Sequence, residues 1–172
     1  MRLKILGLIA GLTLVAACES APETTAGAKG AGAKTPATIT TTQRNMGPLP
    51  GSQEDLVMSV GDRVFFDFDK YNVKADARKT LEKQAVWLKK YPSLVITVEG
   101  HTDERGTREY NLALGERRAN STKDYLIALG VNPNRLKTIS YGKERPVALG
   151  SNEAAWAQNR RAVTTIGLPP KK

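Results

Sequence analysis

Hydrophobic and polar positions divide the 172-residue chain into three parts. An apolar stretch of about 13 residues, Ile5–Ala17, follows the basic residues Arg2 and Lys4. It is shorter than the roughly 20 residues that span a bilayer core, and it has the length of a signal-peptide core. Residues 19–58 are rich in Ala, Thr, Gly, Pro and Lys, which predicts a disordered linker. Apolar patterning then runs from about residue 60 to 168, enough for one small domain.

The patterned part predicts strands and helices in alternation. Runs of β-branched and aromatic residues predict four strands, at 64–68, 94–98, 136–140 and 162–166. Apolar residues at helical spacing predict a helix through Ala77–Leu88, ended by Pro92. A second helix is expected from an N-cap at Thr107 to Gly130, and a short one at 154–160. The order βαβαβ(α)β predicts an α+β fold, a two-layer sandwich in which helices cover one face of a mixed sheet.

The single cysteine, Cys18, follows the small residues Ala16 and Ala17. A lone cysteine in an exported chain cannot form an internal disulfide, so it is either a free thiol or a modified residue. Its position resembles the lipobox of bacterial lipoproteins, which implies cleavage before Cys18 and acylation. Several acyl chains together anchor a protein firmly, at about 0.8 kcal/mol per buried methylene. In such lipoproteins an aspartate after the cysteine is associated with the inner membrane. Glu19 stands there in this chain, which implies the outer membrane.

Removal of a signal peptide at 1–17 leaves an expected linker at 18–58, starting with the lipid-carrying Cys18, and a folded domain at 59–168. The net charge of +9 for the whole chain falls to +7, because 24 basic and 17 acidic residues remain. A positive charge favours polyanions: nucleic acid, anionic lipid or a cell-wall polymer. Export makes nucleic acid the least expected of the three.

The densest polar cluster, at 100–107, follows the second predicted strand. Loops after strand ends often carry binding residues. Asn111 and Arg118 lie close to two helical turns apart on the next helix and therefore share one face. We place them beside an inward stripe made of Leu112, Gly115, Ala119, Thr122, Leu126 and Leu129. Arg118 can then reach Asp103, either as a structural ion pair or as part of a ligand site, and the pattern alone favours the ion pair.

The segment from Gly100 to Ala119 closely resembles the peptidoglycan-associated lipoproteins, within the wider group of OmpA-like C-terminal domains. Four shorter segments fit the same family in the same order, at 66–71, 140–142, 144–146 and 159–163. The resemblance covers about residues 60–167, and several motifs in register are more specific than one short pattern. Two positions depart from common relatives. Many have Asn in place of His101, and broader OmpA-like domains often have Ser in place of Gly115.

The resemblance implies a pocket for the diaminopimelate residue of the peptidoglycan stem peptide, which carries a carboxylate and an ammonium group on one carbon. Arg118 would bind the carboxylate through two parallel hydrogen bonds, and Asp103 would bind the ammonium. Asn111 would offer both a donor and an acceptor. Three further residues complete the implied site: Phe68, Asp69 and Thr102. No cofactor and no metal are implied.

The family further implies a place in the Tol-Pal system, which draws the outer membrane inward at cell division. A periplasmic β-propeller protein of that system would be a partner. The chain would then tether outer-membrane lipid, through Cys18, to peptidoglycan, with its domain in the periplasm and without catalysis.

Two functions from other classes are less favoured. A cell-wall hydrolase needs two carboxylates about 5–10 Å apart. Glu99, Asp103 and Glu104 are the candidates, but Glu99 lies in a predicted strand and Glu104 in an exposed turn. No Ser or Cys lies in a nucleophile motif, and His101 is the only histidine, with no cysteine nearby to complete a zinc site. A nucleic-acid binder would use the positive charge, but it conflicts with the signal segment.

Cys18→Ser should leave the precursor uncleaved by the lipoprotein pathway and unacylated, because the sulfur that carries the lipid is gone. Mass spectrometry of the mature wild-type N-terminus tests the anchor directly. An unmodified Cys18, or cleavage at another position, would contradict it.

Overall fold

The computed structural model describes residues 47–168, so Cys18, the signal segment and the linker up to residue 46 lie outside the described residues. Helices and strands alternate through the described part. In chain order they are α1 (Gln53–Ser59), β1 (Arg63–Phe65), α2 (Ala75–Lys90), β2 (Ile96–His101), α3 (Arg108–Ala128), the short 3-10 helix η1 (Pro133–Arg135), β3 (Leu136–Gly142), α4 (Glu153–Asn159) and β4 (Arg161–Ile166).

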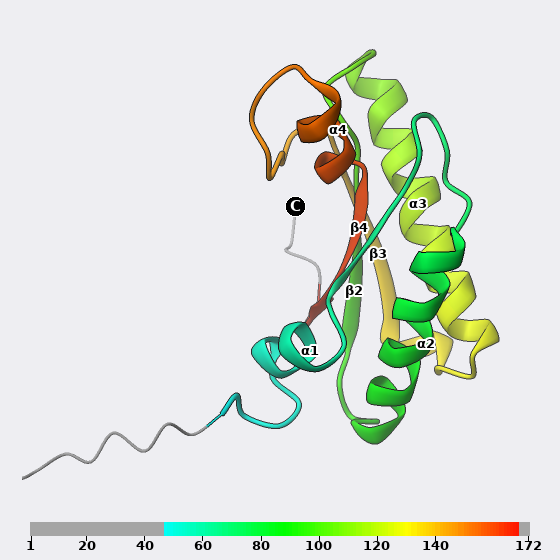
Figure 1. Ribbon diagram of the computed structural model, residues 1–172. Coiled ribbons are helices and arrows are strands. Elements are labelled where there is room, and N and C mark those ends of the chain that lie inside the picture. The colour runs from blue at the N-terminus through cyan, green and yellow to red at the C-terminus, as the bar shows by residue number, and fades with distance from the viewer. Residues whose placement is uncertain (1–46, 169–172) are drawn as a thin grey trace, which may run out of the picture. The chain divides into compact units, whose positions relative to one another are not determined.

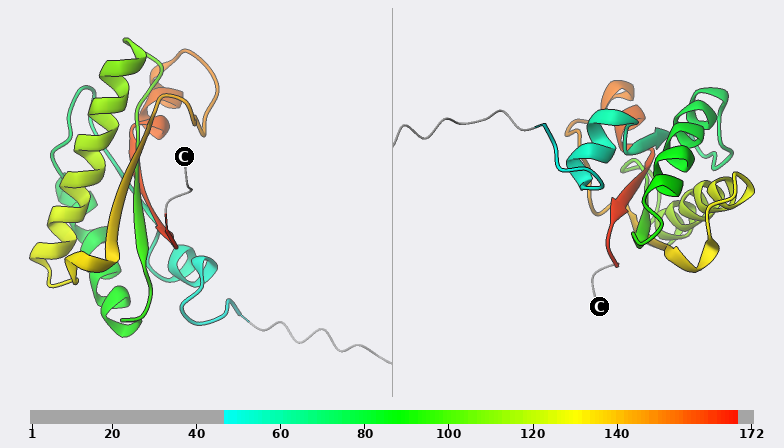
Figure 2. Two further views of the ribbon diagram at one scale, coloured as in Figure 1. Left: turned by 180° about the vertical axis from the view of Figure 1, so that it is seen from behind. Right: turned by 90° about the horizontal axis from the view of Figure 1, so that it is seen from below.

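The four strands form one mixed sheet in the order β1-β4-β2-β3. Strands β2 and β3 are parallel, whereas β4 runs antiparallel to both β1 and β2. Parallel neighbours need a long crossover connection, and α3 provides it between β2 and β3. The long helices α2 and α3 cover the same face of the sheet (Figures 1 and 2). The predicted α+β sandwich is therefore confirmed.

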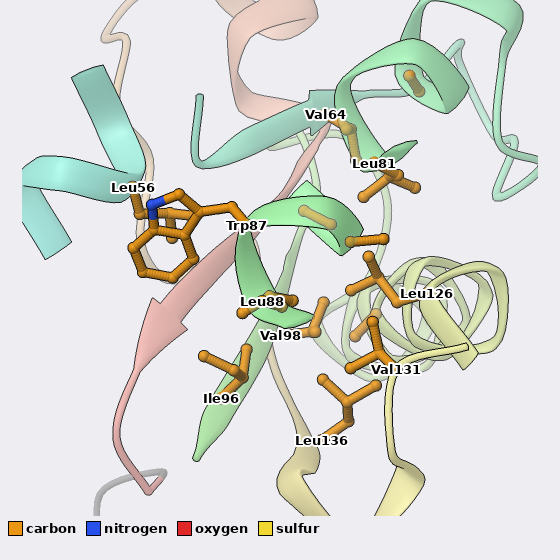
Figure 3. Packing of buried hydrophobic residues seen from close by; sticks show 14 of the residues in the cluster. Leu56, Val64, Leu81, Trp87, Leu88, Ile96, Val98, Leu126, Val131 and Leu136 are labelled. Atoms are coloured by element: carbon orange, nitrogen blue, oxygen red, sulfur yellow. The ribbon is translucent and has the colours of Figure 1, made fainter. Parts of the chain in front are cut away.

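The hydrophobic core lies between the sheet and the two long helices (Figure 3). Strand β2 contributes Ile96 and Val98, α2 contributes Leu81 and Leu88, and α3 contributes Leu126, all without exposed surface. Burial of each such side chain contributes roughly 1.5–3 kcal/mol. This core fixes α3 across β2 and so sets the position of everything that α3 carries.

Helix α1 bonds the part of β4 that lies beyond the first residue of the short strand β1. The Gln53 side chain donates from Nε2 to the carbonyl of Thr164 (3.2 Å) and accepts from the amide of Ile166 at Oε1 (2.9 Å). Leu56 of the same helix is fully buried in the core (Figure 3). This helix lies within the predicted linker. The prediction that the folded domain starts at residue 59 is therefore wrong. The mixed composition of this segment hid a helix of about two turns.

Helix α3 approaches strand β2 most closely where two glycines meet. A Cβ atom on Gly100 would lie 1.8 Å from the carbonyl oxygen of Gly115, and one on Gly115 would lie 2.4 Å from Ser140 Oγ. That hydroxyl donates to the carbonyl of Leu112 at 2.6 Å. No side chain separates helix from strand here, so the first turns of α3 lie directly beside the C-terminal end of β2.

The buried face of α3 is more polar than its apolar pattern predicts. It consists of Asn111, Leu114, Gly115, Arg118, Ala119, Thr122 and Leu126. The prediction that Leu112 points inward is wrong, since this side chain is 39% exposed. The inward face is rotated toward Asn111 and Arg118. Backbone carbonyls at the end of β2, in the loop after it and in the loop between β1 and α2 accept their hydrogen bonds.

Gly100→Ala should lower the free energy of unfolding by at least about 3 kcal/mol. Overpacking costs about 1–3 kcal/mol where the neighbouring side chains can move. Here the neighbour is the backbone of α3, which cannot move away as easily. Urea unfolding measures the loss. Gly47→Ala is the matched control, since a Cβ there meets nothing within 4 Å. Equal urea midpoints for the two variants would contradict the close approach of α3 to β2.

Candidate functional site

The candidate site is a cavity of about 190 Å³ at the C-terminal end of β2. Three segments form it: the loop between β1 and α2, the loop after β2, and the first half of α3. Its lining residues are Phe68, Asp69, Thr102, Asp103, Arg105, Gly106, Tyr110, Asn111, Leu114 and Arg118. The structure thus brings all six residues of the predicted ligand site to one cavity.

Arg118 is fully buried and is held by backbone carbonyls. Its Nε donates to Lys70 O (2.8 Å), its Nη1 to His101 O (2.9 Å) and its Nη2 to Asp67 O (3.1 Å). Burial lowers the pKa of Arg118 to about 10, although the charge of Asp103 opposes the shift, so the side chain stays protonated at neutral pH. A guanidinium has five N–H groups, and two of these remain, one on each Nη.

Asp103 has other partners than the expected Arg118. Its carboxylate accepts from Arg105 Nη2 (2.6 Å), from the amide of Arg105 (3.2 Å) and from Arg160 Nη1 (3.4 Å). Burial acts to raise the pKa of Asp103, but the hydrogen bonds from Arg105 outweigh it, and the pKa lies below its ordinary value. The interpretation as a structural Asp103–Arg118 ion pair is therefore wrong. The two residues face one cavity, each held by a separate set of groups.

Both side-chain N–H groups of Asn111 donate hydrogen bonds to the loop after β2. Its Nδ2 donates to Arg105 O (2.7 Å) and to Thr107 O (3.0 Å). Among the described residues no donor bonds its Oδ1, so only an acceptor is left, where the sequence predicted a donor as well. Thr107 is the N-cap of α3, as predicted, and accepts from the amide of Tyr110. These bonds hold the loop against the start of α3.

The loop between β1 and α2 forms the opposite wall of the cavity. Phe68 exposes 57% of its surface there. Asp69 adopts a left-handed backbone conformation, with φ of 56°, and its carboxylate accepts a hydrogen bond from the hydroxyl of Tyr110. That bond raises the pKa of Tyr110. Thr102 is buried, and its amide donates to Gly142 O (2.9 Å), so it shapes the floor of the site through the backbone.

Sequence reasoning missed Arg105, Tyr110 and Arg160 as parts of the site. Arg105 lies in the polar cluster, yet nothing in its spacing distinguishes it from a solvated side chain. Arg160 bonds Phe66 O (3.1 Å), and it also contacts Asp103 (3.4 Å). Only the fold brings residue 160 beside residue 103.

His101 lies behind the cavity rather than in its lining. Its ring is buried and stacks on Tyr141, with centroids 5.5 Å apart, and its Nε2 is 3.6 Å from Glu99 Oε2. Burial lowers the pKa of His101 against the opposing effect of Glu99. The ring is thus neutral at neutral pH, and its contribution to the site is the carbonyl that binds Arg118.

Between residues 47 and 168, no group of three or more His, Cys, Asp or Glu side chains is placed to hold a metal ion. No helix in that range is long and apolar enough to cross a membrane.

The model of the OmpA family matches residues 65–160, more than half of the chain. The chain belongs to the OmpA family. Within it, a peptidoglycan-associated lipoprotein of Rhizobium meliloti is 62% identical over 118 residues, which cover 69% of this chain and 67% of the relative. One of Agrobacterium fabrum is 61% identical over the same shares. The resemblance to the peptidoglycan-associated lipoproteins is therefore confirmed.

Two solved structures share the fold of this domain. The crystal structure of the peptidoglycan-associated lipoprotein from Burkholderia pseudomallei is 48% identical, with a TM-score of 0.60 over 62% of this chain and 90% of that one. The C-terminal domain of Helicobacter pylori MotB is 27% identical, with a TM-score of 0.58 over 63% of this chain and 85% of that one.

Arg118→Met should lower the free energy of unfolding by roughly 2–5 kcal/mol, because three backbone carbonyls lose a charged donor. Arg117→Met is the control, since the neighbouring side chain is exposed, and it should cost less than about 0.5 kcal/mol. Thermal and urea unfolding of both variants measure the difference. Equal stability would show that the carbonyl contacts contribute nothing.

Proposed function

We propose that this domain binds peptidoglycan without covalent attachment, through the diaminopimelate of the stem peptide. Through an acylated Cys18 it would tether the outer membrane to the cell wall. The names of the relatives, which pair peptidoglycan association with lipid attachment, support both halves of the proposal.

The observation that carries the proposal is one small cavity lined by a fixed cation and an anion. Arg118 keeps two N–H groups beyond its three carbonyl bonds, and these suit the two oxygens of a carboxylate. Asp103 suits an ammonium group, and the free Oδ1 of Asn111 adds an acceptor. A ligand that carries both charges on one carbon satisfies all three residues at once.

The shape of the cavity supports one amino-acid end group as the ligand. At about 190 Å³ it is smaller than the roughly 300–1,000 Å³ of sites that enclose drug-sized molecules. Leu114 and Phe68 offer apolar surface for a methylene chain. Asp69 and Thr102 close the wall and floor. A disaccharide would therefore lie outside the cavity, with the charged end of the diaminopimelate residue inside.

The length of chain between anchor and domain is compatible with the tether. Thirty-four residues separate Cys18 from Gln53, and at about 3.4 Å per residue they span at most about 120 Å. The proposed location is the periplasmic side of the outer membrane.

We further assign the pocket rim to a protein partner, the β-propeller protein of the Tol system. Phe68 and Tyr110 line the cavity and are exposed aromatic residues. Aromatic residues often form the energetic centre of protein interfaces. Partner and peptidoglycan would then exclude each other. Simultaneous binding of purified propeller protein and stem peptide would contradict this assignment.

Binding without cleavage is favoured by the acidity of the candidate carboxylates. A glycosidase needs one carboxyl group whose pKa is raised, so that it can donate a proton. The pKa of Asp103 is lowered, and so is that of Glu104, by the side chains of Ser151 and Trp156. Both groups are ionised at neutral pH and unsuited to act as the acid.

Asp103→Asn and Arg118→Lys should each weaken binding to purified sacculi and to diaminopimelate-containing peptide. Loss of a charge-assisted hydrogen bond costs about 1.5–3 kcal/mol, or roughly 10- to 150-fold in affinity. Lys at 118 keeps the charge but not the two parallel donors. Pull-down and calorimetric titration measure binding.

Asp124→Asn and Arg117→Lys are the matched controls, because both side chains are exposed on α3, and they should bind as wild type. Melting curves identify variants that fail by unfolding. Folded pocket variants with full affinity would exclude this pocket, and soluble muropeptides released from the sacculi would favour the hydrolase instead.

A further inference from the structure

Arg105 occupies the mouth of the cavity between two aromatic rings. Its guanidinium carbon lies 4.0 Å from the ring centroid of Phe68 and 4.0 Å from that of Trp156. Its Nη2 donates to Asp103 Oδ2 at 2.6 Å and its Nε to Oδ1 at 3.3 Å. In the free protein the carboxylate proposed to receive the ammonium of the ligand is therefore already bonded to a cation of the chain itself.

The second cation on Asp103 is held quite differently. Arg160 is buried, and it donates to Phe66 O at 3.1 Å and to Glu153 Oε1 at 2.5 Å. Its contact with Asp103 is longer, at 3.4 Å. Arg160 cannot move away from Asp103 without breaking its bonds to Phe66 and Glu153, so its positive charge stays beside Asp103 when a ligand binds.

Among residues 47–168, the side chain of Arg105 donates hydrogen bonds to Asp103 alone, whereas its backbone is held by other groups. Its carbonyl accepts from Asn111 Nδ2 at 2.7 Å, and Lys143 Nζ donates to the carbonyl of Gly106 at 2.8 Å. The side chain itself is 32% exposed, and Glu153 Oε2 lies 4.0 Å from its Nη2. A displaced guanidinium can thus turn toward solvent and keep a carboxylate partner.

The geometry points to Arg105 as an internal competitor of the ligand. Its guanidinium occupies the ammonium subsite of the free protein and moves out from between Phe68 and Trp156 when the ammonium of the ligand bonds Asp103. This inference rests on the proposed function and adds the origin of its selectivity.

Two consequences follow for recognition. A ligand with a carboxylate alone offers Asp103 no replacement cation, so Arg105 stays in place and the face of Phe68 stays covered. A ligand with both groups releases Arg105, and the freed face of Phe68 then becomes available to its methylene chain. If Arg105 instead bound the carboxylate of the ligand directly, its removal would weaken binding, whereas removal of a competitor strengthens it. The sign of the change in affinity therefore separates the two roles.

Arg105→Ala should tighten binding of the diaminopimelate peptide by roughly two- to tenfold, because the ammonium subsite is no longer filled. Arg108→Ala is the control with the same change in net charge, since Arg108 is exposed and pairs with Glu144 at 3.3 Å. It should bind as wild type. In an Asp103→Asn background, Arg105→Ala should give no gain, because the shared carboxylate is gone.

Trp156 gives an independent signal. Departure of the guanidinium from its ring should change the Trp156 fluorescence during a peptide titration, whereas Arg105→Ala should show no such change. Trp156→Phe identifies the contribution of buried Trp87. Weaker binding by folded Arg105→Ala, or a silent Trp156 in the wild type, would overturn the competitor role. Wild-type affinity in Asp103→Asn and Arg118→Lys would instead reject the pocket itself.

Discussion

The guanidinium of Arg118 joins three parts of the domain that are far apart in the sequence. It extends from α3 to the carbonyl at the end of β2 and to two carbonyls in the loop between β1 and α2. A buried charge is costly unless its hydrogen bonds are satisfied, and here backbone dipoles satisfy it without a carboxylate. The loop that carries Phe68 and Asp69 is consequently held over the cavity. The same three bonds fix the direction of the two N–H groups that remain, so the proposed binding of a carboxylate needs little further ordering.

Arg118 can take this position only because α3 lies so close to β2. The contact between Gly100 and Gly115 removes the layer of side chains that normally separates a helix from a sheet, and the N-cap at Thr107 begins the helix at the end of the loop. Packing and site are therefore consequences of the same local geometry. Leu126 and the rest of the core hold the far end of α3, and the glycine contact sets the near end, where Asn111 and Arg118 meet the strand.

The sequence predicts the parts of this fold that depend on periodic burial. The long helices, the central strands and Thr107 as a cap follow from spacing, and six of the ten cavity residues follow from the family resemblance. Leu112 was misplaced because hydrophobic periodicity cannot register a buried arginine that is satisfied by carbonyls. Helix α1 was missed because its stabilising contacts, from Gln53 to the edge of β4, join residues more than a hundred positions apart. The partners of Asp103 were mistaken for a similar reason, since Arg160 reaches it only through the fold.

Arg105 and Arg118 have the same side chain but different hydrogen-bond acceptors, so they differ in how firmly the fold holds them. The acceptors of Arg118 are backbone carbonyls, which belong to the fold and cannot be offered to a ligand cation without opening the loop. The acceptor of Arg105 is a carboxylate side chain, for which any well-placed ammonium is an equivalent partner. Stacking between two rings adds a modest attraction to that pair, but it places no bond on the fold. In the proposed site one cation would therefore be permanent and the other exchangeable. The site would then be ordered in advance for the anionic group of a ligand and would discriminate by the cationic one.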